Sequence, residues 1–419
     1  AREIYVTSAK NTAFYYEVPA LGFKTRLQVK ANQVTIINGA SGLYPMPEVV
    51  PSEQVSDLGL SITADDPVSV YVYNGKDVSS DGYLAIPVSS WGTEYYALTY
   101  PDFNEARPWK GGFAFMAAED NTEVEITLRS PNFGEYSVTG LNKRTEGGHK
   151  YGDRWKVTLN RGQVYMVQGD GTSRGQFDLS GSRIVATKPV GCIMYHQRTM
   201  IPCFSLGGGR DHINEMIPPT SQWGKSYVTL EIMRGGKGDL YRAVALQDGT
   251  NIFWSSYDFK SGARTNGPTG VLNMKAGEVR SIPKSPEEVV TGPANAKGVI
   301  GIGVFKANKP FLLMHESCSA NWDGSGDYDP FTIYCVAAEQ YTKGTIFQSP
   351  LNSRYTNHFF SLIAIGDTAD PSMKLLKSIK LDGKFVYVIT PSFLGNRIPG
   401  TNFYYVRIPV TSGAHTIYG

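Results

Sequence analysis

Apolar and polar residues alternate along much of the chain with the two-residue period of a half-buried β-strand. Residues 124–128 show this pattern, with Val, Ile and Leu separated by Glu and Thr. Asp120-Asn121 and Asp248-Gly249 suit two-residue hairpin turns, because Asn and Gly tolerate a positive φ. We find no amphipathic pattern that predicts a helix longer than about two turns. The pattern therefore predicts an all-β fold built from many short strands.

The pattern recurs at intervals of about 120 residues, which is the mark of an internal repeat. Strands led by proline are expected at Pro67, Pro189 and Pro310, since a proline that starts a strand costs no ladder hydrogen bond. Three further motifs recur in the same order. A Trp-Gly or Lys-Gly pair begins at residues 91, 223 and 343, and an apolar strand ends in Asp at residues 120, 248 and 367. A turn precedes Val at residues 164 and 279. Their spacings drift by several residues, as variable loops on one scaffold produce.

These recurrent motifs predict three tandem β repeats of about 120 residues after a partial leading copy. We place the leading copy at 1–58 and the repeats at 59–180, 181–300 and 301–419. Each repeat has room for seven or eight short strands, which suit a β-sandwich-like module; the alternative is a propeller-like ring. Another proline-led strand would be due where the sequence stops, so we expect the full-length protein to continue beyond Gly419.

Composition and charge narrow the class of protein. The chain has 45 Gly, 24 Pro and 25 Tyr, which favours strands and tight turns over long helices. Lys and Arg number 40 against 38 Asp and Glu, so the net charge of +2 argues against a dedicated nucleic-acid binder. No stretch approaches eighteen consecutive apolar residues, so no membrane-spanning helix is expected. The first residues form no leader, so a signal peptide was removed or never present.

The four cysteines form two local pairs along the chain. Three connectivities are open to them, and we favour disulfides Cys192–Cys203 and Cys318–Cys335, because each would bracket one loop. An even count in local pairs favours an extracellular location. The alternative is four buried free thiols, and zinc is disfavoured because no C-x-x-C spacing exists.

The best metal candidate lies between the last two cysteines. Asp323, Asp327 and Asp329 lie at nearly alternating positions with glycines between them, and their oxygens could wrap a Ca²⁺ ion. The loop departs from an EF-hand because no Glu closes it. The alternative interpretation is a solvated Asp/Gly turn, and no other cofactor is expected.

Other chemical groups are interpreted as structural. His196, Cys203 and His212 lie close in sequence but have no standard metal spacing, so we expect turn histidines beside a disulfide cysteine. The carboxylates Glu119 and Asp120 belong to a recurrent hairpin rather than to a glycosidase pair. Several tyrosines lie on predicted strands, where they serve either core packing or an exposed binding surface: Tyr95, Tyr96, Tyr100, Tyr404 and Tyr405. No catalytic constellation emerges, so the chain is not expected to be an enzyme.

Several motifs, in the same order, are shared with a known family. They are residues 80–87, 91–100, 118–124, 159–165, 178–184 and 211–219. Together they resemble the N-terminal domain of the IgG Fc-binding protein family, and the resemblance runs from about Leu58 to Gly419. It implies a secreted or extracellular β-rich module of the kind found in large mucus and body-fluid proteins and in bacterial surface proteins.

We therefore expect a non-catalytic, secreted structural or interaction module for adhesion or assembly in a mucus-like or cell-surface layer. Its partner would be an extracellular protein or glycan. The alternative is a lectin-like carbohydrate-binding module that uses Tyr and Trp surfaces with Ca²⁺. A glycan hydrolase is the third hypothesis, and it would need a carboxylate pair in a deep cleft.

Overall fold

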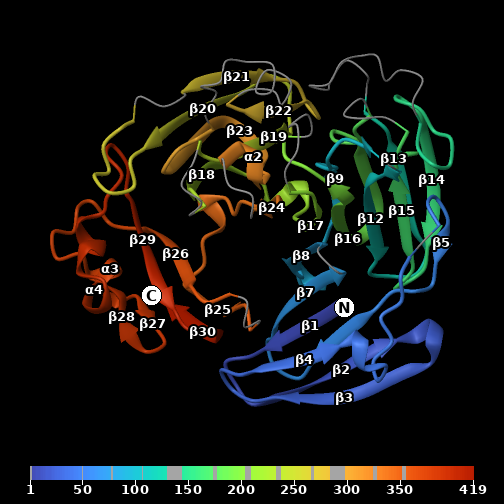
Figure 1. The fold of residues 1–419 in the computed structure, drawn as a ribbon, viewed down its shortest axis with the longest axis horizontal. Helices are drawn as coiled ribbons and strands as arrows, with labels where there is room; N and C mark the ends of the chain where they lie inside the picture. The colour runs from blue at the N-terminus through green and yellow to red at the C-terminus, as the bar shows by residue number, and fades with distance from the viewer. Residues whose placement is uncertain are drawn as a thin grey trace.

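The computed structural model describes most of the chain as β-strands joined by turns and short helices (Figure 1). The described residues are 2–49, 51–76, 79–105, 107–129, 144–172, 177–202, 209–232, 237–265, 269–283, 298–323, 328–351 and 355–419. The helices within them have three to five residues each. None of these described helices has the length and apolar character to cross a bilayer. The predicted all-β class is confirmed.

Apart from one short hairpin, the strands between residues 92 and 217 belong to one eight-stranded sheet, which we call module 2. They are β9 (Gly92–Tyr96), β12 (Gly111–Ala117), β13 (Thr122–Thr127), β14 (Arg154–Leu159), β15 (Val164–Gln168), β16 (Arg183–Thr199) and β17 (Asp211–Ile217), and β5 (Val55–Ser56) joins at one edge. A separate hairpin pairs β10 (Phe103–Asn104) with β11 (Pro108–Trp109). The sheet order is β14-β13-β16-β12-β15-β5, and β9 and β17 also pair with β16.

The strands between residues 224 and 334 form module 3, whose sheet has the same plan. They are β18 (Gly224–Leu230), β19 (Leu240–Ala245), β20 (Thr250–Tyr257), β21 (Gly270–Met274), β22 (Val279–Ile282), β23 (Ile302–Ser317) and β24 (Phe331–Tyr334), with α2 (Ala320–Asp323) before β24. The order is β21-β20-β23-β19-β22, and β18 and β24 also pair with β23. The seven strands of module 3 thus match those of module 2 from β9 to β17 in chain order and in pairing.

Side-chain hydrogen bonds repeat as well. The Tyr95 hydroxyl donates to the carbonyl of Val190 at 2.6 Å, and the Tyr227 hydroxyl donates to the carbonyl of Phe311 in the same place of module 3. Each of these tyrosine hydroxyls also accepts a hydrogen bond from the first glycine of its own strand. These contacts join the first strand to the long central strand in both modules.

Module 1 comprises residues 2–84 and has a related pattern split over two sheets. Its strands are β1 (Arg2–Thr7), β2 (Thr12–Val18), β3 (Phe23–Val29), β4 (Val34–Asn38), β6 (Ser61–Ala64), β7 (Ser69–Lys76) and β8 (Ser79–Leu84). The sheets have the orders β4-β1-β7-β8 and β3-β2-β6. Together β6 and β7 take the place of the long strand β16, with Pro67 between them. The leading copy therefore includes the strand of Pro67 rather than ending near residue 58.

Module 4 comprises residues 344–418 and also consists of two small sheets. Its elements are β25 (Gly344–Ser349), β26 (His358–Ile365), α3 (Lys374–Ser378), β27 (Lys380–Leu381), β28 (Lys384–Phe385), α4 (Val386–Ile389), β29 (Phe403–Val410) and β30 (Gly413–Tyr418). The sheets have the orders β25-β30-β27-β28 and β26-β29. Here β30 pairs with β25 and β27 as the first half of β16 pairs with β9 and β13.

The long strands explain the role of the recurrent prolines. Pro189 and Pro310 lie inside β16 and β23, so the prediction that they start strands is wrong. The first half of β16 pairs with β13 and β9, and the second half pairs with β12 and β17. The register shifts between Val185 and Val190. Because proline lacks an N–H, it suits the point where the strand leaves one pair of neighbours and joins the next.

Sheet membership divides the chain at other points than the predicted repeat boundaries. The boundaries near 180 and 300 fall just before β16 and β23, although each of these strands is the centre of the preceding module's sheet. The two-residue hairpin predictions are wrong, because β12 and β13 do not pair with each other and neither do β19 and β20; each pairs with the long strand β16 or β23 instead. The positive φ expected of the turn residues is present, at 55° for Asn121 and 69° for Gly249. The turn residues are thus readable from sequence, while the grouping of strands depends on contacts far apart in the chain.

The modules are arranged in a ring (Figure 1). Modules 2 and 3 share one hydrophobic core, because Val244, Leu312 and Met314 of module 3 join the buried cluster of module 2. Modules 1 and 4 meet on the other side, where the Ser69 hydroxyl donates to the carbonyl of Ile346 at 3.1 Å. The last strands β8, β17 and β24 of the first three modules lie side by side near the centre of the ring.

Candidate functional site

The predicted disulfides are absent from the structure. Cys192 and Cys335 are buried free thiols, and burial raises the pKa of both. The backbone N–H of Cys335 donates to the carbonyl of Leu313, five residues before Cys318 on an extended strand. That spacing separates the two cysteines by roughly 16 Å along the strand, whereas a bridge needs Cα atoms within about 7 Å.

The other predicted bridge fails for a similar reason. Cys192 lies in the second half of β16, opposite Phe115 and Ile217. The strand carries the chain roughly 23 Å from Cys192 to Thr199, and four further residues span at most roughly 14 Å. Cys203 itself lies outside the described residues. The prediction that two cysteines on either side of a loop form a disulfide fails here, because the chain from Cys192 to Thr199 is an extended strand and does not fold back.

The predicted calcium loop is largely beyond the described part of the chain. Asp327 and the side chain of Asp323 lie outside it, and Asp329 is exposed. Among the described residues, no group of three or more His, Cys, Asp or Glu side chains could hold a metal ion. The calcium site stays a prediction.

The two histidines of β16 and β17 have structural partners. His196 is fully buried, its Nε2 lies 2.9 Å from the carbonyl of Pro101, and its Nδ1 accepts from the N–H of Arg198. Burial lowers the pKa of His196 to about 3, so it is neutral in the fold. His212 Nδ1 lies 2.9 Å from the carbonyl of His196. Each ring is thus oriented by backbone groups.

The tyrosines considered for surface binding are buried, which agrees with the core-packing interpretation. Their exposed fractions are 1% for Tyr95, 9% for Tyr96, 2% for Tyr100, 5% for Tyr404 and 1% for Tyr405. Successive side chains of a strand face opposite sides, and here both sides are covered. These tyrosines cannot stack on a ligand at the surface.

A buried ion pair connects modules 2 and 3. Arg242 of β19 lies 2.7 Å from Asp178, and their side chains are 1% and 0% exposed. Asp178 also accepts from Ser180 and from Thr99, whose carbonyl accepts a further hydrogen bond from Arg242. Burial opposes ionisation of Asp178, but the guanidinium groups of Arg242 and Arg129 and the hydrogen bonds from Ser180 together outweigh it and hold the pKa of Asp178 below its usual range. Sequence reasoning missed this pair, although an arginine within the apolar run 240–245 was the available signal.

Three further carboxylates lie along the row of last strands. Asp211 accepts hydrogen bonds from the hydroxyl of Ser79 and the N–H of Ser80, and Asp81 accepts from the N–H of Asn214. Glu215 reaches across the next junction and accepts from the N–H of Tyr334. These side chains therefore connect module 2 to module 1 on one side and to module 3 on the other.

Burial strongly raises the pKa of these three carboxyl groups. It raises the pKa of Asp211 to about 6 and that of Glu215 to about 8, against the backbone N–H groups that favour ionisation. It also raises the pKa of Asp81 well above its usual value. Perturbed carboxylates often mark active sites, but structural networks produce them too. All three have protein donors, as junction residues would.

One small cavity lies where modules 2 and 3 meet. It has a volume of about 10 Å³, which is room for about one water molecule. Its lining comes from both modules and includes Thr99, Tyr195, Ile213, Met314 and Glu316. A cavity of this size cannot admit a sugar or a peptide side chain.

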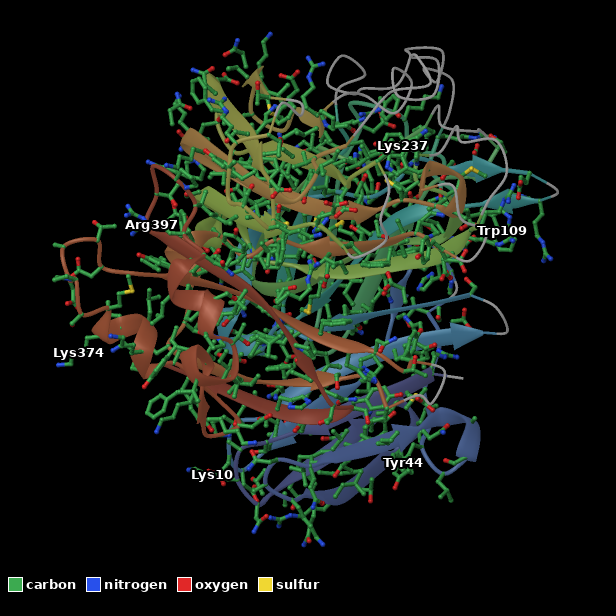
Figure 2. The ribbon with its side chains drawn as sticks, turned by 60° about the vertical axis from the view of Figure 1, so that its left-hand side comes forward. Lys10, Tyr44, Trp109, Lys237, Lys374 and Arg397 are labelled. Atoms are coloured by element: carbon green, nitrogen blue, oxygen red, sulfur yellow. The ribbon has the colours of Figure 1, made fainter. Side chains whose placement is uncertain are left out.

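Module 4 instead presents apolar side chains to solvent. Nine of the nineteen exposed large apolar residues in the described chain lie in it: Leu351, Tyr355, Phe359, Ile365, Leu375, Phe385, Val388, Ile389 and Tyr418. Val388 of α4 and Leu375 of α3 are the most exposed, at 60% and 57%. In Figure 2, the neighbouring Lys374 projects from the outer edge of this module. Exposed apolar groups gathered on one module are typical of a protein-binding surface.

Comparison with known proteins identifies the relationship. The family described as "IgGFc binding protein" matches residues 81–419, which include modules 2, 3 and 4. The human protein named IgGFc-binding protein is 25% identical over 347 residues, which are 83% of this chain and 5% of the human protein. The chain thus spans about one twentieth of that relative's length. No solved structure matches the chain at a significant level.

Proposed function

Because the chain belongs to the IgGFc binding protein family, we propose that it is a non-catalytic, extracellular module that binds a protein partner. The observation that carries this proposal is the family match over residues 81–419, more than three quarters of the chain. Its task would be adhesion or assembly within a mucus-like or cell-surface layer. The ring of β modules supplies a rigid body, and the surface of module 4 supplies the contact.

An immunoglobulin Fc fragment is the first partner to test. The name of the human relative states such binding for that protein, and this chain has 25% identity to it. Immobilised Fc should bind the chain in a surface-binding assay, whereas Fab from the same antibody should not. Equal binding to both fragments, or to neither, would contradict Fc recognition.

The contact surface can be tested with matched variants. Val388→Asp places a charge on the apolar surface of module 4, where Val388 is 60% exposed. Val271→Asp places the same charge on β21 of module 3, where Val271 is 52% exposed. We expect only the first change to weaken partner binding, by roughly tenfold for a central contact. An equal effect of both changes would assign the contact elsewhere.

The absence of catalysis is part of the proposal. The carboxylates Asp81, Asp211 and Glu215, whose pKa is raised, accept hydrogen bonds from protein groups, and none of them lines the small cavity between modules 2 and 3. A hydrolase acting on glycans would need two carboxyl groups facing an open cleft. Incubation with a panel of glycans and peptides should leave them intact, and turnover that Glu215→Gln abolishes would overturn this part.

The lectin-like alternative has little support, since the tyrosines it relied on are buried. Glycan-array binding with and without a chelator remains its test. Binding that the chelator removes would favour it and would place calcium at residues 323–329.

An extracellular location predicts a disulfide. With Cys192 and Cys335 as free thiols, Cys203 and Cys318 are the pair that remains. Ile201 and Ser319, close to them in sequence, exchange hydrogen bonds through the N–H of each residue. We expect the intact mass after alkylation in denaturant to show two modified thiols and one bridge. Four modified thiols in protein purified without reductant would contradict secretion through an oxidising compartment.

A further inference from the structure

The short hairpin of β10 and β11 is held against the end of β16. The N–H of Gln197 donates to the carbonyl of Lys110 at 2.9 Å, and the N–H of Lys110 donates to the side chain of Gln197 at 3.2 Å. The preceding residue, Trp109, is half-buried, and Figure 2 shows it at the opposite edge of the view from Lys374 of module 4. Trp109 is thus fixed beside β16 and keeps part of its indole ring in solvent.

Two guanidinium groups lie over the Trp109 indole. The Cζ of Arg107 is 4.9 Å from the ring centroid, and the Cζ of Arg198 is 5.5 Å from it. Arg198 lies within the register shift of β16 between His196 and Thr199, where an irregular strand can direct a side chain toward a neighbouring element. A guanidinium group stacks on indole because the face of the ring is negative. The indole therefore orders two long side chains at the surface.

Positive charge is in excess beside the indole. Glu105 pairs closely with Arg210, whereas the distance from Glu105 to Arg198 is 3.9 Å, at the limit of an ion pair. Arg107 is exposed, and among the described residues its guanidinium has no carboxylate or carbonyl partner. A guanidinium has five N–H donors. Several donors of Arg107 and Arg198 are therefore left for solvent or for a ligand.

Other arginines that stack on aromatic rings in this chain also bind a protein oxygen. Arg26 lies 5.4 Å from the ring centroid of Tyr15 and pairs with Asp65 at 2.6 Å. Three further arginines over aromatic rings donate hydrogen bonds to protein oxygens: Arg129, Arg242 and Arg407. Arg107 differs from all of these, because it stacks in the same way but its charge is not neutralised within the described chain.

The chemistry of these groups indicates an acidic peptide as the ligand. A guanidinium presents paired N–H donors that match both oxygens of a carboxylate, and stacking on an indole fixes their direction. Trp and Arg are also among the residue types that contribute most at protein interfaces. A densely sulfated polysaccharide fits less well, because the carboxylates Glu105 and Glu146 lie among the cations and repel a long row of sulfate groups.

We propose that Arg107, Arg198 and Trp109 form a recognition site for an acidic segment of a partner protein. One carboxylate of the segment accepts two hydrogen bonds from Arg107. A second carboxylate approaches Arg198, whose contact with Glu105 is long. The site lies in module 2, away from the surface proposed for Fc in module 4, and it does not depend on Fc binding.

The probe is a synthetic peptide with the sequence GDEDEDG, labelled for fluorescence anisotropy. The control peptide, GNQNQNG, replaces each carboxylate by an amide of nearly the same shape. We expect the full chain to bind the acidic peptide at least about tenfold more tightly than the control, since an amide cannot form the charged contact. Added salt should weaken the acidic peptide and leave the control unchanged. Equal binding of the two peptides would overturn the proposal.

A matched pair of variants tests the role of the unpaired guanidinium. Arg107→Gln removes it, and Arg26→Gln removes a guanidinium that stacks on Tyr15 but is paired with Asp65. Both arginines are exposed, so both variants should keep the melting temperature of the parent chain. We expect Arg107→Gln to weaken the acidic peptide about fivefold and Arg26→Gln to leave it unchanged. Equal losses would show that the peptide responds to net charge alone and would overturn the assignment.

Two further variants test the geometry of the site. Arg107→Lys keeps the charge but presents no planar pair of donors, so we expect binding about threefold weaker than that of the parent chain. Peptide binding should also change the tryptophan fluorescence of the chain, and Trp109→Phe should remove that change. Full binding by Arg107→Lys would overturn the two-bond contact. A fluorescence change that persists in Trp109→Phe would place the peptide elsewhere and overturn the site.

Competition experiments distinguish the remaining ligands. A fully sulfated heparin hexasaccharide should bind more weakly than the acidic peptide at the same ionic strength. Tighter binding of the hexasaccharide, lost in Arg107→Gln, would assign the site to a sulfated glycan and overturn the acidic peptide. Fc and the acidic peptide should bind the chain together, in either order of addition. Mutual exclusion would place both on one surface and overturn the separate site, whereas absence of Fc binding would leave the peptide result intact.

Discussion

Modules 3 and 4 are neighbours with related strand pairing, yet their second strands β19 and β26 have different numbers of partners among the described strands. In module 3, the long strand β23 runs through the sheet and covers β19 and β20. In module 4, β30 pairs with β25 and β27, and among the described strands β26 pairs with β29 on one edge. The difference teaches that a strand's burial in this fold depends on one long central strand. Similar apolar runs become core or surface according to whether that strand reaches them.

The junction between modules 2 and 3 is also more extensively packed than the junction between modules 3 and 4. Modules 2 and 3 share a hydrophobic core and the buried pair of Arg242 and Asp178. Modules 3 and 4 meet through a smaller cluster around Ile302 and Tyr405, and Arg407 donates to the carbonyl of Glu231. We infer that modules 2 and 3 unfold as one unit and that module 4 is attached more weakly.

The largest effect is expected at the first of these junctions. Asp178→Asn leaves the Arg242 charge buried without its counter-ion and should cost about 3–5 kcal/mol of unfolding free energy, measured with urea. Arg407→Gln at the next junction should cost about 1 kcal/mol, because it removes a hydrogen bond to a neutral carbonyl. Glu123→Gln, which breaks an exposed pair with Lys156, should cost less than about 1 kcal/mol. Equal losses for the first two variants would contradict the difference between the junctions.

Core truncation sharpens the comparison within modules. Leu312→Ala on β23 empties a fully buried position and should cost about 3 kcal/mol. Leu362→Ala on β26 removes a partly buried side chain and should cost about 1 kcal/mol. Both values come from urea unfolding monitored by tryptophan fluorescence. A cost for Leu362→Ala as large as that for Leu312→Ala would show that module 4 is as tightly packed as its neighbour.

The pH dependence should separate the junction of modules 2 and 3 from module 4. Burial raises the pKa of Glu215 to about 8, so between its ordinary value and about pH 8 the folded state holds a proton that the unfolded state has lost. Stability from this group is therefore highest in acid and falls as the pH rises through that window, by up to roughly 5 kcal/mol. Glu215→Gln should flatten the fall. An unchanged profile in the variant would assign the dependence to other groups.

The smallest expected effect is on the rate at which the buried cysteine thiols react with an alkylating reagent, and not on the stability of the fold. Cys192 and Cys335 are buried in modules 2 and 3, and burial raises the pKa of both thiols. Neither should react with an alkylating reagent at pH 8 until denaturant is added. Reaction in the folded chain would show that modules 2 and 3 open locally. Peptide mapping by mass spectrometry identifies which thiol has reacted.

Local features of the fold were predictable from sequence. The turns at Asn121 and Gly249 follow from residues that accept a positive φ, and the β class follows from alternation. That these turns connect strands which pair with a third strand, and not with each other, was not predictable. The order of the recurrent motifs reflects the shared pairing of modules 2 and 3. The extent of the long strands was not predictable, because Pro189 reads as a strand start when its pairing partners are unknown.

The candidate site was harder to predict. Proximity of Cys318 to Cys335 in sequence suggested a bridge, but an extended strand carries them apart. The tyrosines on predicted strands could have faced either way, and only the packing of both faces buries Tyr95 and Tyr405. The pairing of Arg242 with Asp178 joins residues 64 positions apart and leaves little local signal. Sequence patterns specify elements, whereas contacts between elements decide which groups are exposed.

The contact between modules 1 and 4 has a mechanical consequence. A ring of four bodies linked in series transmits tension through every junction, unless the first and last bodies are joined directly. The Ser69 contact with Ile346 makes that join. A pull applied between residues 2 and 419 would therefore load this short contact first and spare the shared core of modules 2 and 3. Under flow or shear, modules 1 and 4 would therefore separate from each other before any of the four modules unfolds.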